Sequence, residues 1–144
     1  MRLFKMTMIL ACCGLVAAVV ATAGGTMLRV EKTPIGKVVA NSKGLTLYMF
    51  RRDAHGKSAC YGGCAGVWPP VITSGKPVAG PGLKASLLGT SKRTDGKLQV
   101  TYKGYPLYTY VGDSKPSQTA GEGLKQFGAS WYALTPKGVQ IDRD

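Results

Sequence analysis

The sequence predicts a mostly β fold: a small antiparallel β domain built from two pseudo-twofold-related hairpin repeats, with little helix outside the signal segment. The first observation is a repeat, since "GLTLYMFRRD" at residues 44–53 returns as "GYPLYTYVGD" at residues 104–113. The second is that each copy follows another short apolar run across a glycine-containing turn. The third is composition: long helical periodicity is absent, and 20 Gly with 8 Pro suit turns better than helices.

The two repeats are expected at about residues 36–73 and 96–136. "KVVANSKGLTLYMF" and "KLQVTYKGYPLYTY" align without a gap at a constant offset of sixty residues. In each, a turn separates two β-rich runs, which predicts an antiparallel hairpin. Downstream runs "SWYALTP" and "GVQID" indicate returning strands, and residues 83–88 could form one helical turn. Two copies are too few for a solenoid, so we expect two units packed about a pseudo-twofold axis.

The second strand of the first repeat is predicted to lie centrally, covered on both sides. Side chains alternate between the two faces of a strand. Here neither face is polar: one carries Leu45, Leu47 and Met49, and the other carries Thr46, Tyr48 and Phe50.

The repeated motif places two aromatic residues on one strand face and an aspartate where the strand ends. A buried tyrosine needs a hydrogen-bond partner for its hydroxyl, and a carboxylate at a strand end can fix the next turn through backbone N–H groups. An architectural role is therefore expected, with two carboxylates facing each other as a metal or acid/base site as the alternative. The six motif residues are Tyr48, Phe50, Asp53, Tyr108, Tyr110 and Asp113.

The N-terminus has the pattern of a signal peptide over residues 1–23. Arg2 and Lys5 precede an uncharged apolar run that ends in Ala21-Thr-Ala23, the small-x-small pattern of a cleavage site. A membrane anchor and lipid attachment at Cys12 are the alternatives, because the run is close to the ~18 residues that suggest a span. Residues 24–34 are expected to be a flexible linker, and residues 35–144 a single domain.

The composition is strongly basic, with a formal net charge of +12. The Lys and Arg residues are scattered along the chain, which favours general attraction to anionic surfaces over a shaped site. No nucleic-acid-binding motif is present, so nucleic acid is not expected as a partner. Membrane contact is expected only through the N-terminal segment, if it is uncleaved or acylated.

Cys60 and Cys64 are the two cysteines outside the signal segment. An even count in an oxidising compartment predicts a structural disulfide between them. The spacing does not fit haem attachment or a thioredoxin-like centre. Metal binding by Asp53, His55, Cys60 and Cys64 stays open as an alternative, chemically suited to zinc or copper. No cofactor is predicted.

Three aromatic residues outside the motif could form either a carbohydrate platform or part of the core; these are Trp68, Trp131 and Tyr132. Tryptophans that cap a small β core are the commoner arrangement. No catalytic triad, phosphate loop or metalloprotease motif is present, so an enzyme is not expected.

The paired motifs resemble the signature of bacterial secreted repeat proteins and lipoproteins with a Yx(FWY)xxD motif. "CYGGCAGVWPPV", "DGKLQVTYKGYPLY" and "GEGLKQFGASWYAL" also resemble segments of that family. The resemblance covers about residues 35–136 and implies an exported envelope protein, often lipid-anchored, in a family without an established biochemical role. This chain departs from it in lacking a convincing lipobox.

These observations predict a non-catalytic exported module of the cell envelope, periplasmic or extracellular and either free or membrane-attached. Its expected partners are anionic surface polymers or another envelope protein. The alternative is a periplasmic metal-handling or redox-linked protein that uses the loop containing Asp53, His55, Cys60 and Cys64.

Overall fold

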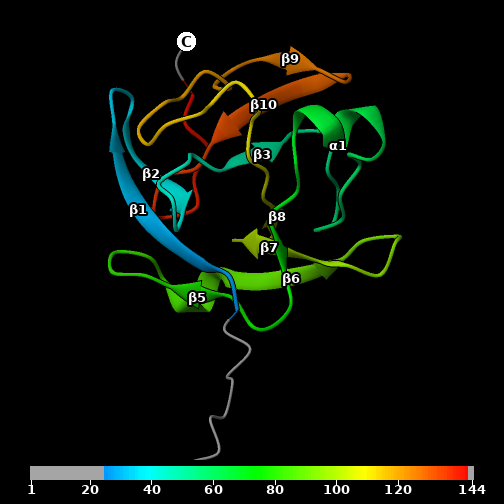
Figure 1. Ribbon diagram of the computed structural model, residues 1–144, viewed down its shortest axis with the longest axis horizontal. Helices are drawn as coiled ribbons and strands as arrows, with labels where there is room; N and C mark the ends of the chain where they lie inside the picture. Colours follow the sequence, from blue (N-terminus) through cyan, green and yellow to red (C-terminus); the bar gives the residue numbers. More distant parts are fainter. Residues whose placement is uncertain (1–24, 143–144) are drawn as a thin grey trace, which may run out of the picture.

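The computed structural model describes residues 25–142, which form several small antiparallel sheets around a shared core (Figure 1). The predicted signal segment lies outside the described residues. No helix within them is long and apolar enough to cross a membrane. The elements in chain order are β1 Met27–Thr33, β2 Gly36–Asn41, β3 Tyr48–Phe50, α1 Gly63–Val67, β4 Ile72–Thr73, β5 Val78–Ala79, the 3-10 helix Ala85–Leu87, β6 Leu88–Lys92, β7 Leu98–Tyr102, β8 Tyr105–Pro106, β9 Lys125–Gln126 and β10 Ala129–Ala133.

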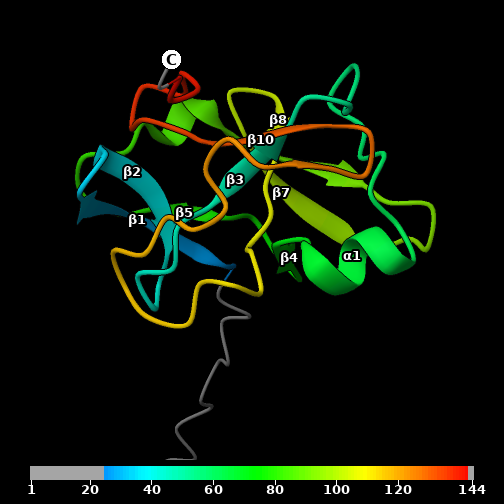
Figure 2. The same ribbon diagram turned by 90° about the horizontal axis from the view of Figure 1, so that it is seen from above.

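The strands form three sheets, two of which combine strands of the first and second repeats. β1 pairs with β2 and, in parallel, with β5; β3 pairs with β10, which also pairs with β9; β7 pairs with β4, β6 and β8. Figures 1 and 2 both place α1 at the opposite side of the molecule from the β1–β2 hairpin. The predicted fold class, mostly β with little helix, is confirmed.

Strand β1 corrects the prediction of a flexible linker over residues 24–34. Residues 28–33 pair with β2, and Met27 pairs with β5. Leu28 is fully buried, whereas Arg29 beside it is exposed. This alternation is that of a half-buried strand, but the adjacent charges of Glu31 and Lys32 interrupt it in the sequence. Each repeat therefore opens with a hairpin, β1–β2 in the first and β6–β7 in the second.

The offset of sixty that aligns the two motifs does not extend into the preceding strands. Thr46 bridges Ala40, whereas its counterpart Pro106 pairs with Thr101. The turn in the first repeat is one residue longer, because the side chain of Asn41 accepts two backbone N–H groups within it. The gapless alignment is therefore wrong by one residue between β2 and β7.

The core consists of two adjoining clusters. One is largely aliphatic and collects residues from the hairpins of both repeats, including Leu28, Leu47, Val100 and Leu107. The other is largely aromatic and contains both motif tyrosines, both tryptophans and the disulfide. The strand from Thr46 to Phe50 is buried at every position, as predicted for a strand covered on both sides. The aromatic cluster contains the candidate site.

Candidate functional site

Tyr48 and Tyr108 lie side by side where the two repeats meet. The N–H of each donates to the C=O of the other, over 2.8 and 3.0 Å, so that they form an isolated antiparallel bridge. Such a reciprocal pair is what a local twofold axis between the repeats requires. Both tyrosines are fully buried, as the repeated motif predicts.

Each motif tyrosine bonds to the aspartate of the other repeat. The Tyr48 hydroxyl donates to Oδ2 of Asp113 over 2.5 Å, and the Tyr108 hydroxyl donates to Oδ2 of Asp53 over 2.7 Å. A buried phenol needs a partner of this kind. The two links cross the twofold axis, so neither repeat can satisfy its own tyrosine.

The second oxygen of each aspartate holds the loop that follows its own strand. Oδ1 of Asp53 accepts from the N–H of Ala59 over 2.8 Å, and Oδ1 of Asp113 accepts from the N–H of Ala120 over 2.9 Å. The backbone bonds predicted from the motif are therefore confirmed. Each carboxylate lies against a tyrosine and a loop N–H rather than against the other carboxylate, the alternative arrangement.

Burial raises the pKa of both tyrosine hydroxyls and of one of the aspartates, Asp53. In addition to burial, the neighbouring aspartate raises the pKa of each tyrosine. For Asp53, the N–H of Ala59 and the hydroxyl of Tyr108 counteract the effect of burial on the pKa only in part. The tyrosines consequently remain protonated donors, and Asp53 is a stronger base than an aspartate in water.

Four aromatic rings form one continuous stack across the twofold axis. Trp68 and Trp131 lie at its centre, with ring centroids 3.9 Å apart and planes 4° from parallel. Phe50 stacks on Trp131 at 3.9 Å, and Tyr110 stacks on Trp68 at 4.4 Å. Each motif thus supplies the ring that covers the tryptophan of the other repeat. We call these four residues the aromatic column.

The motif tyrosines meet the aromatic column edge-on, Tyr48 at 5.4 Å from Trp68 and Tyr108 at 5.1 Å from Trp131. Both indole N–H groups donate to Gln126 of β9, one to its side chain and one to its backbone carbonyl. The tryptophans are fully buried, so they belong to the core and cannot act as an exposed carbohydrate platform. Tyr132, which follows Trp131 in the sequence, packs against the aliphatic cluster instead.

A buried arginine, Arg93, lies near only one of the two tyrosine–aspartate pairs, the pair of Tyr108 and Asp53. Arg93 is 6% exposed, and its guanidinium donates to Ser58 Oγ, Gln99 Oε1 and the carbonyl of Cys60 over 2.7–3.0 Å. It also lies 4.2 Å from the ring centroid of Tyr61. Neutral acceptors in fixed positions thus satisfy the cation, as a buried charge requires.

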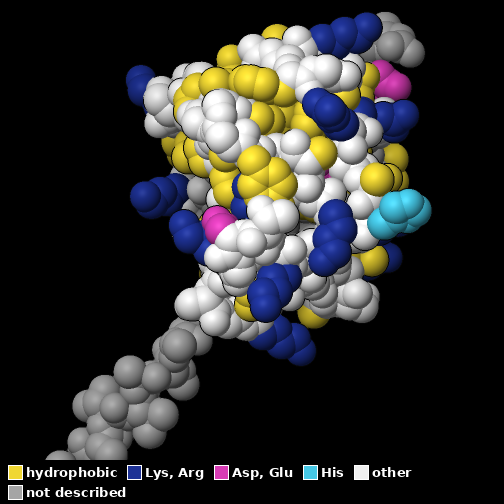
Figure 3. Space-filling model, turned by 90° about the vertical axis from the view of Figure 1, so that its right-hand side faces the viewer, with side chains coloured by type: hydrophobic (Ala, Val, Ile, Leu, Met, Phe, Trp, Pro, Cys, Tyr) yellow, Lys and Arg dark blue, Asp and Glu magenta, His cyan; other side chains and the backbone are white. Residues whose placement is uncertain are grey.

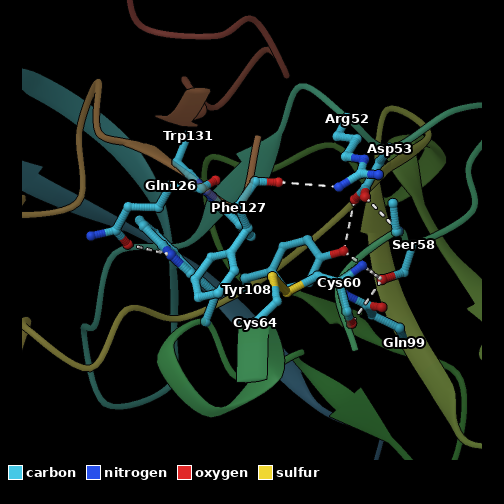
Figure 4. The surroundings of a disulfide bond; sticks show 12 residues. Arg52, Asp53, Ser58, Cys60, Cys64, Gln99, Tyr108, Gln126, Phe127 and Trp131 are labelled. Carbon is cyan, nitrogen blue, oxygen red and sulfur yellow. Dashed lines mark hydrogen bonds between the residues drawn. A yellow bond between two sulfur atoms is a disulfide. The ribbon is translucent and has the colours of Figure 1, made fainter. Parts of the chain in front are cut away.

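Ser58 connects this arginine to the nearer tyrosine–aspartate pair. Figure 4 shows Ser58 beside Tyr108 and Asp53. Ser58 Oγ lies 2.7 Å from the Tyr108 hydroxyl, which in turn donates to Asp53. The position equivalent to Arg93 in the first repeat is occupied by Thr33. This follows when the β1–β2 pairing is compared with the β6–β7 pairing. The polar network Asp53–Tyr108–Ser58–Arg93 therefore exists at one end of the core only.

The Cys60–Cys64 disulfide predicted from the sequence is present. It joins Cys60, in the loop before α1, to Cys64 within α1, and both residues pack in the aromatic cluster. Because the sulfurs are bonded to each other, no thiolate is free for the alternative metal site. His55 is exposed at a left-handed φ of 53°, and the described residues contain no group of three His, Cys, Asp or Glu that could hold a metal ion.

A comparison with known protein families shows which family the chain belongs to. The model of a family described as "Secreted repeat of unknown function" matches it twice, over residues 30–72 and 89–135. The chain belongs to this family of secreted repeats. No curated protein and no solved structure matches it. Each matched segment begins within the opening hairpin of a repeat, in β1 or β6, in agreement with the structural repeats.

The structure adds residues to the site that the sequence analysis did not name. The sequence prediction missed Arg93 and Ser58, because one arginine among many and one serine in a loop carry no distinguishing pattern. It also missed Gln126, whose side chain and backbone bind both indoles. The signal that could have marked Arg93 is its place at the end of β6, where the matching turn of the first repeat has Thr33.

Proposed function

We propose that this secreted repeat protein is a non-catalytic binding module that associates with anionic polymers of the cell envelope. The observation that carries the proposal is a pair of lysines, Lys32 and Lys37, which face each other across β1 and β2 on the rim of a groove. Like charges directly opposite in a sheet destabilise it. An unfavourable pair at a surface groove is explained if an anion binds there.

The surface as a whole favours the same class of partner. Within residues 25–142, every Lys and Arg is exposed except Arg93, whereas the exposed acids are only Asp95 and Asp142. The motif aspartates bond to tyrosines, and Glu31 accepts from Arg29 and Ser117. Figure 3 shows Lys and Arg side chains spread over one face with few acids among them. Such a field concentrates anions near the surface.

The groove between the lysines has the dimensions and the lining of a binding site. Its volume is about 430 Å³, within the ~300–1,000 Å³ that small-molecule sites occupy, so it could hold one charged unit of a polymer. Aliphatic and proline side chains form its apolar part, and no acidic residue lines it. The lining residues are Val30, Lys32, Lys37, Pro81, Gly82 and Pro136.

The second repeat provides an internal comparison. There the groove beside β6 and β7 contains Leu98 where the first repeat has Lys37, so Lys92 faces a leucine instead of a second lysine. Only the first repeat combines a groove with two facing cations. We therefore place the binding site at the β1–β2 hairpin.

Binding of poly(glycerol phosphate), measured by calorimetry with neutral dextran as the reference polymer, tests the proposal. We expect binding that weakens steeply with salt, because the Debye length falls from about 30 Å at 0.01 M to about 3 Å at 1 M. The double variant Lys32→Gln/Lys37→Gln should lose most of this affinity. Its thermal stability should stay the same or rise, since a like-charge contact is removed.

The matched control is Lys92→Gln/Lys97→Gln, which removes the same charge from the second repeat. It should weaken binding only slightly. Equal losses in the two double variants would show general surface attraction and would overturn the groove. No binding to the anionic polymer at low salt would overturn the proposed function itself and leave another envelope protein as the partner to be sought.

A further inference from the structure

The aromatic column and the two tyrosine–aspartate pairs together have the geometry of a radical relay. The centroids of consecutive rings in the column lie 3.9–4.4 Å apart. Rings in van der Waals contact exchange an electron readily, and tryptophan and tyrosine are the side chains of the aromatic cluster that lose an electron most easily. The column therefore offers a conducting path between the two repeats.

A tyrosine needs a proton acceptor to be oxidised, because the phenol radical cation is a very strong acid and loses its proton. Tyr48 and Tyr108 each have a carboxylate oxygen within hydrogen-bond distance, at 2.5 and 2.7 Å. Water cannot play this part for Tyr48, since Tyr48 is fully buried and Asp113 is 5% exposed. The raised pKa of Asp53 makes that carboxylate a better acceptor of the proton.

We propose that this core accepts an electron hole from a one-electron oxidant and holds it as a neutral tyrosyl radical. The oxidant removes one electron from a tryptophan of the column and is itself reduced by one electron. The motif tyrosine then gives an electron to the tryptophan radical cation and its phenolic proton to the aspartate. The products are neutral Trp, Tyr–O• and Asp–COOH, so charge and atoms balance.

The path reaches the surface at one end of the column. Tyr110, the last ring beyond Trp68, is partly exposed, whereas Phe50 at the other end is 1% exposed and not readily oxidised. Both tryptophans are fully buried, so a diffusing oxidant takes its electron from Trp68 across the partly exposed ring of Tyr110, which stacks on it at 4.4 Å. From Trp68 the hole can pass to Tyr48 directly, or to Tyr108 through Trp131.

Architecture alone does not require ionisable carboxylates at these positions. An asparagine oxygen could accept the N–H of Ala59 or Ala120, and it would avoid the cost of burying a charge. A phenylalanine would fill the same space as either tyrosine without needing a partner. Unlike asparagine or phenylalanine at these positions, a tyrosine beside an aspartate can pass its phenolic proton to the carboxylate.

Pulse radiolysis in azide solution tests the relay on the full-length folded protein, because the azidyl radical is a one-electron oxidant that attacks tryptophan preferentially. We expect a tryptophan radical that decays as a tyrosyl radical rises, at one rate that does not depend on protein concentration. In Asp53→Asn/Asp113→Asn the tryptophan radical should persist and the tyrosyl yield should fall. Tyr48→Phe/Tyr108→Phe should give the same loss.

Asp95→Asn/Asp142→Asn is the matched control, since it removes two exposed carboxylates, and it should behave as the wild type does. Tyr105→Phe/Tyr132→Phe, which alters two tyrosines outside the column, should also keep the tyrosyl yield. Equal tyrosyl yields in the wild type and in both core double variants would overturn the relay. If a core variant does not fold, the wild type decides: an unchanged transfer rate in D2O would contradict proton transfer to the aspartates.

Discussion

The hydroxyl of Tyr48 in the first repeat is held by Asp113 of the second, 65 residues further along the chain. The reciprocal bond runs from Tyr108 to Asp53. Because both bonds cross the twofold axis, each repeat depends on the other to satisfy a buried hydroxyl. The repeated motif therefore links the two repeats to each other, and does not merely end a strand in each repeat independently.

Removing the two tyrosine hydroxyls should destabilise the protein to different extents. In Tyr48→Phe, the buried Asp113 loses a partner that water cannot replace, so we expect a loss toward ~3 kcal/mol of the free energy of unfolding. In Tyr108→Phe, water can reach the partly exposed Asp53, so the loss should be about 1 kcal/mol. Urea unfolding of both variants measures the difference, and the reverse order would contradict the burial argument.

The pH dependence of stability should reveal the raised pKa of Asp53. A carboxyl whose pKa is higher in the folded state binds a proton more tightly there, so it favours folding as the pH falls. We therefore expect the wild type to gain stability relative to Asp53→Asn as the pH falls through the folded pKa. The gain should level off below the unfolded value of about 3.9. Asp95→Asn, at an exposed site, serves as the control.

Arg93→Lys should destabilise the protein although it keeps the charge. The planar guanidinium donates to three acceptors at once, a geometry that an ammonium group cannot match. We expect a loss of about 1.5–3 kcal/mol, as for hydrogen bonds to charged groups. Arg52→Lys, at an exposed site, should change stability by less than about 0.5 kcal/mol. Similar changes in the free energy of unfolding in both variants would mean that the hydrogen bonds of Arg93 do not stabilise the fold.

Removing the disulfide should lower stability without changing the fold. On the chain-entropy estimate, closing so short a loop stabilises the folded state by about 2 kcal/mol. Cys60→Ser/Cys64→Ser should therefore unfold at lower urea concentration while keeping the near-ultraviolet circular dichroism of the stacked tryptophans. Reduction of the wild type should give the same shift. Loss of that spectrum in the variant would show that the disulfide is needed to form the aromatic cluster.

The sequence could predict the motif, the hairpins and the disulfide, because each depends on residues close together in the chain. Turn residues, alternation and the spacing of Cys60 and Cys64 are local signals. The crossed bonds could not be predicted, since nothing in one repeat indicates that Tyr48 lies closer to Asp113 than to Asp53. Strand β1 was missed for a different reason: with three charged residues in seven, it resembles a solvated linker until β2 is placed beside it.

A double-mutant cycle tests the crossed pairing most directly. The variants are Tyr48→Phe with Asp113→Asn across the repeats, and Tyr48→Phe with Asp53→Asn within one repeat. For the crossed pair we expect an interaction free energy of about 0.5–3 kcal/mol, the range for residues in contact. For the pair within one repeat it should lie within about 0.5 kcal/mol of zero. A larger coupling between Tyr48 and Asp53 than between Tyr48 and Asp113 would contradict the account.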